Sequence, residues 1–109
     1  MAEIVWTEPA LQDLDTIAEY IALDNPEAAG NLVIDIFATV ERLAEYPKSG
    51  KTIRELRRSP CREIVVSPCR IFYRPEKAHV YLLHVIRTEK LFRKFLLKER
   101  NRKRKKFQP

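Results

Sequence analysis

The segment from Cys61 to Arg87 constrains the fold of this 109-residue chain more than any other part, because it carries three β-rich runs separated by two short turns. Val, Ile, Phe, Tyr and Leu dominate these runs, which is typical of strands. The runs are Cys61–Val66, Cys69–Arg74 and His79–Arg87. A proline lies in each break, in Ser67-Pro68 and in Pro75–Ala78, and favours a turn there. We therefore predict an antiparallel meander.

The two predicted hairpins decide which side chains share a face of the sheet. Closing the first on Ser67-Pro68 pairs Ile64 with Ile71, and closing the second on Pro75–Ala78 pairs Ile71 with Leu82. One face is then apolar and consists of Ile64, Val66, Ile71, Tyr73, Val80, Leu82 and Ile86. The other is mixed and consists of Glu63, Val65, Arg70, Phe72, Arg74, His79, Tyr81 and Leu83. We predict that the mixed face is a functional surface, although an ordinary half-solvated sheet face has the same pattern.

Two amphipathic helices precede the meander. A short apolar run at Glu3–Trp6 suits an edge strand, and Thr7 then caps a helix that continues to about Leu23. A second helix starts at Pro26 and continues to Tyr46, after which proline and glycine end it. Apolar residues recur at steps of three and four in both segments. The short connection predicts an antiparallel helical hairpin.

The region after the meander divides into two parts. Thr88 can cap a last helix. Its apolar residues are Leu91, Phe92, Phe95 and Leu96. The run from Arg100 to Lys106 has six basic residues and no apolar one, so we expect a solvated tail, or a tail that contacts nucleic acid or an acidic partner. A truncation after Glu99 should then leave the fold intact. Before the meander, Thr52–Leu56 is either a further strand or a polar lead-in.

These elements predict an α+β fold in the order β-α-α-β-β-β, in which a helical hairpin packs on a twisted antiparallel sheet and a C-terminal helix follows. We expect a single domain over residues 1–99 and a basic tail over residues 100–109. The N-terminus lacks the pattern of a signal peptide, and no apolar run reaches the length of a membrane span. We therefore expect a cytoplasmic protein that does not contact the membrane.

Cofactor and metal chemistry find little support in the sequence. The chain has two glycines, Gly30 and Gly50, too few for a phosphate-binding or dinucleotide-binding loop. Cys61 and Cys69 do not face each other in the predicted hairpin, so we expect two thiols. The cysteines and histidines lack the spacing of zinc ligands. We expect no cofactor and no metal site.

Charge is divided unevenly along the chain. The first 46 residues carry ten acidic side chains and one basic one, whereas the remaining 63 carry five acidic and twenty basic ones. A basic second half favours an anionic partner, which is nucleic acid, an acidic protein segment or the acidic half of the chain itself. The residues that we predict for a binding surface are Arg62, Arg70, Arg74, Tyr81, Arg87, Arg100, Arg102, Lys103 and Arg104. Alternatively, the arginines beside the sheet pair with Glu55, Glu63 or the acidic helices.

Three segments carry a resemblance to a known family. They are Asp24–Ala29, Leu43–Gly50 and Arg70–Arg74. With the order of elements over about residues 3 to 90, they resemble the RelE/ParE superfamily of bacterial toxins. The resemblance implies a cognate antitoxin that neutralises the toxin with an extended, acidic C-terminal segment, and a toxin–antitoxin heterotetramer is one assembly that such a pair forms.

Two activities occur in this superfamily, so the fold alone does not decide between them. RelE-like members cleave mRNA on the ribosome, and Arg70 and Arg87 lie where such nucleases commonly have arginines. A nuclease also often has His or Tyr after the second position, whereas this chain has Thr88-Glu89-Lys90. ParE-like members bind DNA gyrase and need no catalytic residue. We therefore expect a gyrase inhibitor, with ribosome-dependent mRNA cleavage as the alternative.

Overall fold

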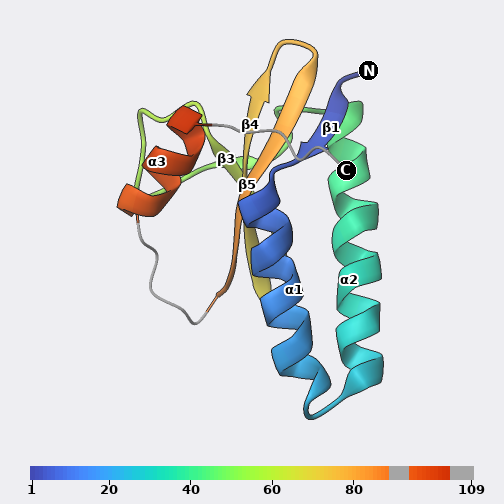
Figure 1. The fold of residues 1–109 in the computed structure, drawn as a ribbon. Helices are drawn as coiled ribbons and strands as arrows, with labels where there is room; N and C mark the ends of the chain where they lie inside the picture. The colour runs from blue at the N-terminus through green and yellow to red at the C-terminus, as the bar shows by residue number, and fades with distance from the viewer. Residues whose placement is uncertain (89–93, 104–109) are drawn as a thin grey trace.

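A computed structural model describes residues 1–88 and 94–103. It contains a helical hairpin, a five-stranded sheet and a C-terminal helix (Figure 1). The elements are β1 (Glu3–Trp6), α1 (Glu8–Ala22), α2 (Pro26–Glu41), a 3-10 turn η1 (Arg42–Ala44), β2 (Lys51–Thr52), β3 (Arg62–Val66), β4 (Cys69–Glu76), β5 (His79–Arg87) and α3 (Lys94–Lys103). The α+β class and the helical hairpin are as the sequence predicts.

Local sequence explains both long helices. The side chain of Thr7 caps α1 by accepting a hydrogen bond from the backbone N–H of Ala10, and Asn25 caps α2 in the same way. A proline follows each cap in the first helical turn, where its missing N–H costs nothing. The two helices lie side by side against one face of the sheet, and α3 lies on the other side of it (Figure 1).

The strand order in the sheet is β1-β5-β4-β3-β2. The pairs from β2 to β5 are antiparallel, as predicted, but β1 runs parallel to β5, with Glu3 beside His79 and Trp6 beside Leu82. The sheet is therefore mixed. The chain between β1 and β5 contains the helical hairpin and three strands, and so long a connection permits this parallel pairing, which strand composition alone does not reveal.

The register of the second hairpin differs from the prediction. The strand β4 continues through Pro75 to Glu76, so the turn contains just Lys77 and Ala78. Lys77 has a φ of 51°, as the first residue of a two-residue hairpin turn requires. The prediction ended the strand at Arg74 and placed Pro75 in the turn, but a proline removes only its own donor and is tolerated near a strand terminus.

A β-bulge adds to this difference. Tyr73 pairs with Leu82 whereas Phe72 pairs with His84, so that Leu83 is the extra residue on β5. Ile71 consequently lies opposite Val85 and not Leu82. Because of this extra residue, the side chains of β5 after Leu83 lie on the opposite face of the sheet from the one predicted.

Two apolar cores result, one on each side of the sheet. The helix-side core comprises Ala10, Leu14, Leu32, Ile36, Val40, Leu43, Cys69, Ile71, Tyr73, Val80, Leu82 and Val85. The loop-side core comprises Ile53, Leu56, Cys61, Phe72, Leu83, Ile86 and Leu97. Cys61 and Cys69 thus lie in different cores and remain two thiols, as predicted.

The loop-side core changes the interpretation of the mixed face. Phe72 and Leu83 were assigned to a partly solvated surface, but both are fully buried. Their covering comes from the loop at 53–61 and from α3, through Ile53, Leu56 and Leu97. In the sequence these covering residues are isolated apolar side chains among charged ones. They have no periodicity that would predict a buried segment.

Gly50 occupies a tight position between β2 and the helix-side core. Its N–H donates to the Tyr73 hydroxyl over 2.9 Å, and its carbonyl accepts a hydrogen bond from Arg62 over 2.8 Å. A Cβ atom at this position would lie 2.5 Å from the Tyr73 hydroxyl and 2.7 Å from the carbonyl oxygen of Glu63. Backbone on one side and a buried ring on the other leave no room for a methyl group.

We therefore expect Gly50→Ala to lower the free energy of unfolding by about 1 to 3 kcal/mol, the usual cost of overpacking. Gly30→Ala provides the matched control, because nothing lies within 4 Å of its Cβ position and Gly30 is inside α2. That change should raise the stability by roughly 0.5 to 1 kcal/mol. Urea unfolding of both variants measures the two effects. Changes in unfolding free energy of the same sign would contradict the tight packing around Gly50.

Candidate functional surfaces

Arg70 connects three segments of the loop-side face. Its guanidinium donates to Glu63 on β3, with 3.2 Å from Nε to Oε2, and to Glu55 in the loop, with 3.1 Å from Nη2 to Oε1. The guanidinium carbon also lies 4.9 Å from the centre of the Phe72 ring. Two carboxylates therefore face one guanidinium, and their combined negative charge exceeds its positive charge.

The pKa values agree with this pairing. Burial alone would lower the pKa of Arg70, but the hydrogen bonds that it donates to Glu55 and Glu63 outweigh this effect and raise the pKa above its ordinary value. The hydrogen bond from Arg70 lowers the pKa of Glu55. Arg70 thus fixes the loop to the sheet as a cation whose donors are already engaged.

Arg87 lies on the opposite side of the sheet from Arg70. Arg70 is paired with Ile86, a member of the loop-side core, so the next residue along β5 points to the helices. The guanidinium carbon of Arg87 lies 4.5 Å from the centre of the Tyr20 ring on α1. This is a cation–π contact between β5 and the helical hairpin. The two arginines that a nuclease would use together are therefore separated by the sheet.

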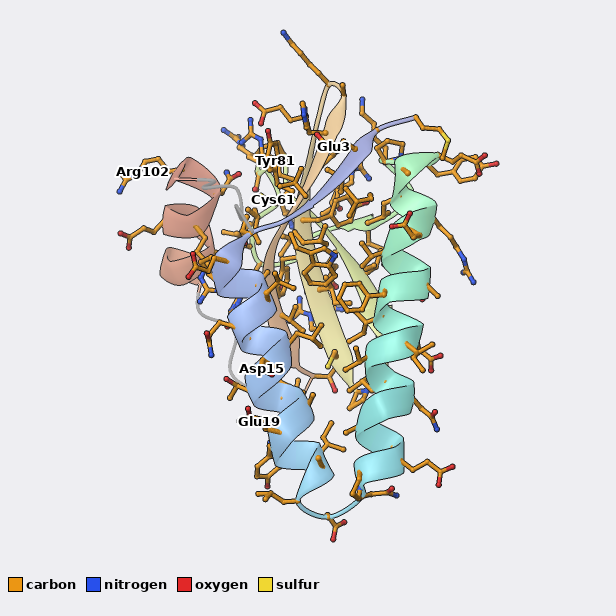
Figure 2. All side chains as sticks on the ribbon, turned by 45° about the vertical axis from the view of Figure 1, so that its right-hand side comes forward. Glu3, Asp15, Glu19, Cys61, Tyr81 and Arg102 are labelled. Carbon is orange, nitrogen blue, oxygen red and sulfur yellow. The ribbon has the colours of Figure 1, made fainter. Side chains whose placement is uncertain are left out.

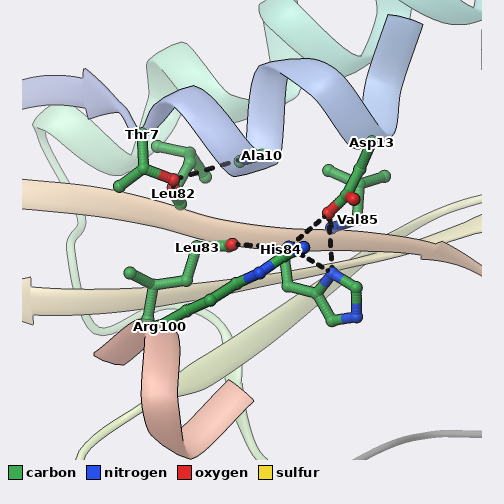
Figure 3. A network of polar contacts seen from close by, with 8 residues as sticks. All are labelled: Thr7, Ala10, Asp13, Leu82, Leu83, His84, Val85 and Arg100. Carbon is green, nitrogen blue, oxygen red and sulfur yellow. Dashed lines mark hydrogen bonds and ion pairs between the residues drawn. The ribbon is translucent and has the colours of Figure 1, made fainter. Parts of the chain in front are cut away.

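A polar cluster of Asp13, His84 and Arg100 joins α1, β5 and α3 (Figure 3). Asp13 Oδ2 lies 2.6 Å from His84 Nδ1 and 2.7 Å from Arg100 Nη1. Because an ionised carboxylate can only accept, the bond to Asp13 requires the tautomer of His84 with hydrogen on Nδ1. Arg100 Nη1 lies 2.8 Å from the same nitrogen. Arg100 Nη1 also donates to the carbonyl of Leu83 over 3.2 Å. His84 itself is buried.

Asp13 remains ionised in this cluster. Burial by itself would raise the pKa of Asp13, but hydrogen bonds from His84, Arg100 and the Val85 N–H together outweigh it and hold the pKa below the ordinary value. Sequence reasoning missed this group, because Asp13 is one of several acids on α1 and Arg100 begins a basic run. No short-range signal marks a contact between residues 87 positions apart.

The cluster also covers a strand edge. The strand β1 pairs with β5 as far as Leu82, where Thr7 Oγ1 donates to the Leu82 carbonyl over 2.7 Å. Beyond that point Asp13 accepts a hydrogen bond from the Val85 N–H over 3.0 Å, and Arg100 donates one to the Leu83 carbonyl. Side chains from two helices thereby satisfy backbone groups that an open sheet edge would leave exposed.

A second group of predicted residues lies near the tip of the β4–β5 hairpin. Arg74 donates to Asn101 on α3 over 3.1 Å. Tyr81 stacks on His79 with 5.6 Å between the ring centres, and His79 Nε2 lies 2.9 Å from the Glu3 carboxylate. These side chains hold α3 and β1 beside the hairpin, so they too contact other parts of the chain.

Comparison with known proteins identifies the family. A family model described as the ParE toxin of type II toxin–antitoxin systems, parDE, matches residues 4–92. The chain belongs to the ParE toxin family. It is 34% identical over 95 residues to Toxin RelE2 of Caulobacter vibrioides, a match covering 84% of this chain and all of that protein. These findings confirm the predicted RelE/ParE superfamily membership.

Two further proteins resemble this ParE-family toxin. Putative toxin Y4kP of Sinorhizobium fredii is 48% identical over 58 residues, which cover 49% of the present chain and 60% of Y4kP. A solved structure titled chromosomal ParDE TA system from P. aeruginosa superposes with a TM-score of 0.66 at 26% identity. That superposition covers 80% of the present chain and 96% of its neighbour.

The toxin does not assemble the predicted binding residues into one surface. Arg62, Arg70, Arg74, Arg87 and Arg100 each contact another part of the chain. Arg102 is exposed and projects from α3 (Figure 2), and Lys103 is the last residue of that helix. Arg104 lies outside the described residues, as do Leu91 and Phe92 of the predicted apolar stripe.

Arg100 requires a correction to the predicted boundary between domain and tail. The sequence places it at the start of a solvated run, but it lies inside α3 and pairs with Asp13. The helix therefore extends past Glu99 and is attached by residues from the basic run itself. Among the described residues, no helix is long and apolar enough to cross a membrane.

Proposed function

We propose that this ParE-family toxin inhibits DNA gyrase by protein–protein contact in the cytoplasm and so blocks replication until a cognate antitoxin neutralises it. The observation that carries this proposal is the separation of Arg70 and Arg87 by the sheet. A gyrase inhibitor of this kind needs a contact surface and no catalytic constellation.

The arrangement of the arginines disfavours RNA cleavage. Attack by a 2′-hydroxyl requires a proton acceptor and positive charge at the same phosphate. Arg70 is engaged by Glu55 and Glu63, while Arg87 lies on the ring of Tyr20. His84 is poorly placed to act as a base on RNA, because its side chain is buried. The name of Toxin RelE2, a relative over most of the chain, supports mRNA cleavage as the second candidate.

Two assays on the purified toxin distinguish these candidates. We expect inhibition of gyrase-catalysed DNA supercoiling and no codon-specific cuts in toeprints of programmed ribosomes. Arg70→Ala should change gyrase inhibition little unless it loosens the loop, which a melting curve would reveal. Cuts in the ribosomal A site that disappear in Arg70→Ala would replace the gyrase proposal with the nuclease one.

Membership of a type II toxin–antitoxin family implies an antitoxin partner, and we propose that its acidic C-terminal segment orders on the basic half of the toxin. The charge division along the chain supports this proposal. Isothermal titration should show affinity that falls as salt rises, because the charges are screened. Affinity that is independent of salt would show that charge is incidental. Light scattering of the complex would test the proposed heterotetramer.

A further inference from the structure

We propose that the loop after β2 and the helix α3 form a surface that binds the phosphate backbone of duplex DNA. This basic loop surface consists of Lys51, Arg54, Arg57, Arg58, Lys98 and Arg102. The choice of DNA over RNA rests on the proposed function, since gyrase acts on DNA. None of the first five residues belongs to the predicted binding set.

The charges of the basic loop surface are available to a partner. All six side chains belong to exposed residues. In the described part of the chain no ion pair engages any of them. The one acid between Lys51 and Arg62 is Glu55, which pairs with Arg70 and also attracts the neighbouring Arg54 through its charge. On α3, the exposed acid Glu99 follows Lys98 in the sequence.

The loop holds these cations in place. Ile53 is fully buried and Leu56 nearly so, both in the loop-side core. The N–H of Leu56 bonds to the carbonyl of Ile53, and the N–H of Ser59 bonds to that of Leu56, which closes two successive turns. Glu55 is held by Arg70. The arginines therefore project from an anchored backbone, so binding orders little of the chain.

The basic side chains gather around two hollows that share the loop. The charged residues that line the first are Lys51, Arg54, Arg62 and Arg70, together with Glu55 and Glu63. Both of these carboxylates pair with Arg70. Arg57, Arg58 and Lys98 line the second, so α3 adds its charge to that of the loop. Arg102 lies one turn beyond Lys98 and projects from the helix (Figure 2).

The composition of the surface favours duplex DNA over other anions. Guanidinium groups match phosphate oxygens with two parallel hydrogen bonds. The linings of both hollows contain no aromatic residue, so they offer no platform for the bases of a single strand. No exposed large apolar residue lines either hollow, so the hollows themselves offer no apolar anchor to a polypeptide partner.

Removal of three arginines tests the proposal. We expect Arg54→Gln, Arg57→Gln and Arg58→Gln together to weaken binding to a labelled duplex at least about tenfold at 0.1 M salt. The slope of log affinity against log salt concentration should become shallower by about 2 to 3, since each phosphate contact contributes about 0.9. Fluorescence anisotropy over about 50 to 200 mM salt measures both quantities.

A second triple variant is the matched control. Arg42→Gln, Lys48→Gln and Lys77→Gln remove the same charge from three exposed residues outside the basic loop surface. Its affinity for the duplex should change by about twofold or less. Equal losses in the two variants would overturn the proposal, because net charge alone would then explain binding.

Three further outcomes also decide the matter. Tighter binding of single-stranded DNA than of the duplex would overturn the choice of ligand, and so would loss of antitoxin affinity with DNA affinity retained. If the loop variant melts early, Arg54→Gln and Arg58→Gln are measured singly, and an unchanged slope in both overturns the proposal. Inhibition of gyrase-catalysed supercoiling by the wild-type toxin tests the proposed function separately, since DNA binding is measured without gyrase.

Discussion

Replacing Asp13 with alanine should lower the free energy of unfolding by about 3 kcal/mol, near the lower end of the cost of breaking a buried ion pair. The carboxylate accepts from His84, Arg100 and the Val85 N–H, and its side chain is 18% exposed. Its removal leaves a largely buried guanidinium and a backbone donor without this acceptor. Chemical denaturation with the linear extrapolation measures the loss.

Asp15→Ala is the control for that variant. Asp15 is two residues along α1 and exposed, and Figure 2 shows it on the outer side of the helix. We expect a change within about 0.5 kcal/mol. Equal losses of unfolding free energy in the two variants would mean that negative charge anywhere on α1, and not this cluster, stabilises the protein. Adding Arg100→Gln to the Asp13→Ala variant should cost little more, because the pair is already broken.

The same carboxylate predicts how stability depends on pH. The folded state lowers the pKa of Asp13 below its unfolded value of about 3.9, so the unfolded chain binds the proton first as the pH falls. The contribution of Asp13 is therefore fully present above about pH 5, and acid removes it progressively below that. The difference in stability between the wild type and Asp13→Ala should narrow in acid and stay constant near neutrality.

Local patterns predicted the parts of the fold that depend on neighbours in sequence. The caps Thr7 and Asn25 and the first hairpin, with Ile64 opposite Ile71, are confirmed. The predicted register of the second hairpin was wrong. The bulge at Leu83 and the continuation of β4 through Pro75 depend on the segments that pack against these strands. A single extra residue reverses every face beyond it.

The candidate surfaces show the same limit. The sequence indicates that arginine matters here, but it does not distinguish an arginine engaged inside the fold from one available to a partner. Arg70 pairs with two acidic residues brought from 7 and 15 residues away, whereas no ion pair in the described chain engages Arg57. Only the assembled loop-side core reveals that Ile53 and Leu56 anchor the loop and leave its arginines outside.

A series of three chain ends should show that α3 is an integral part of the fold. Ending the chain at Lys103 should leave the melting temperature within a few degrees of wild type. Ending it at Glu99 removes Arg100 and Asn101, which bond to Asp13 and Arg74, and should lower it by about 10 °C. This reverses the expectation from the sequence that the basic run is dispensable for folding.

Ending the chain at Arg93 should cost still more, because it also removes Leu97. That side chain is fully buried in the loop-side core, and losing a buried leucine costs about 2 to 5 kcal/mol. Leu97→Ala in the full chain separates this packing from the polar attachments, with exposed Lys98→Ala as its control. Calorimetry of the series would contradict the structure if the Glu99 and Lys103 chain ends melted together.

The chain that ends at Lys103 also isolates what the basic residues after α3 contribute to function. Ending at Lys103 removes Arg104, Lys105 and Lys106 but keeps the basic loop surface and every described contact of α3. If those charges act through counterion release, toxicity should fall at low expression and return at high expression, because affinity falls while the fold is retained. Full toxicity at low expression would show that the loop surface suffices without them.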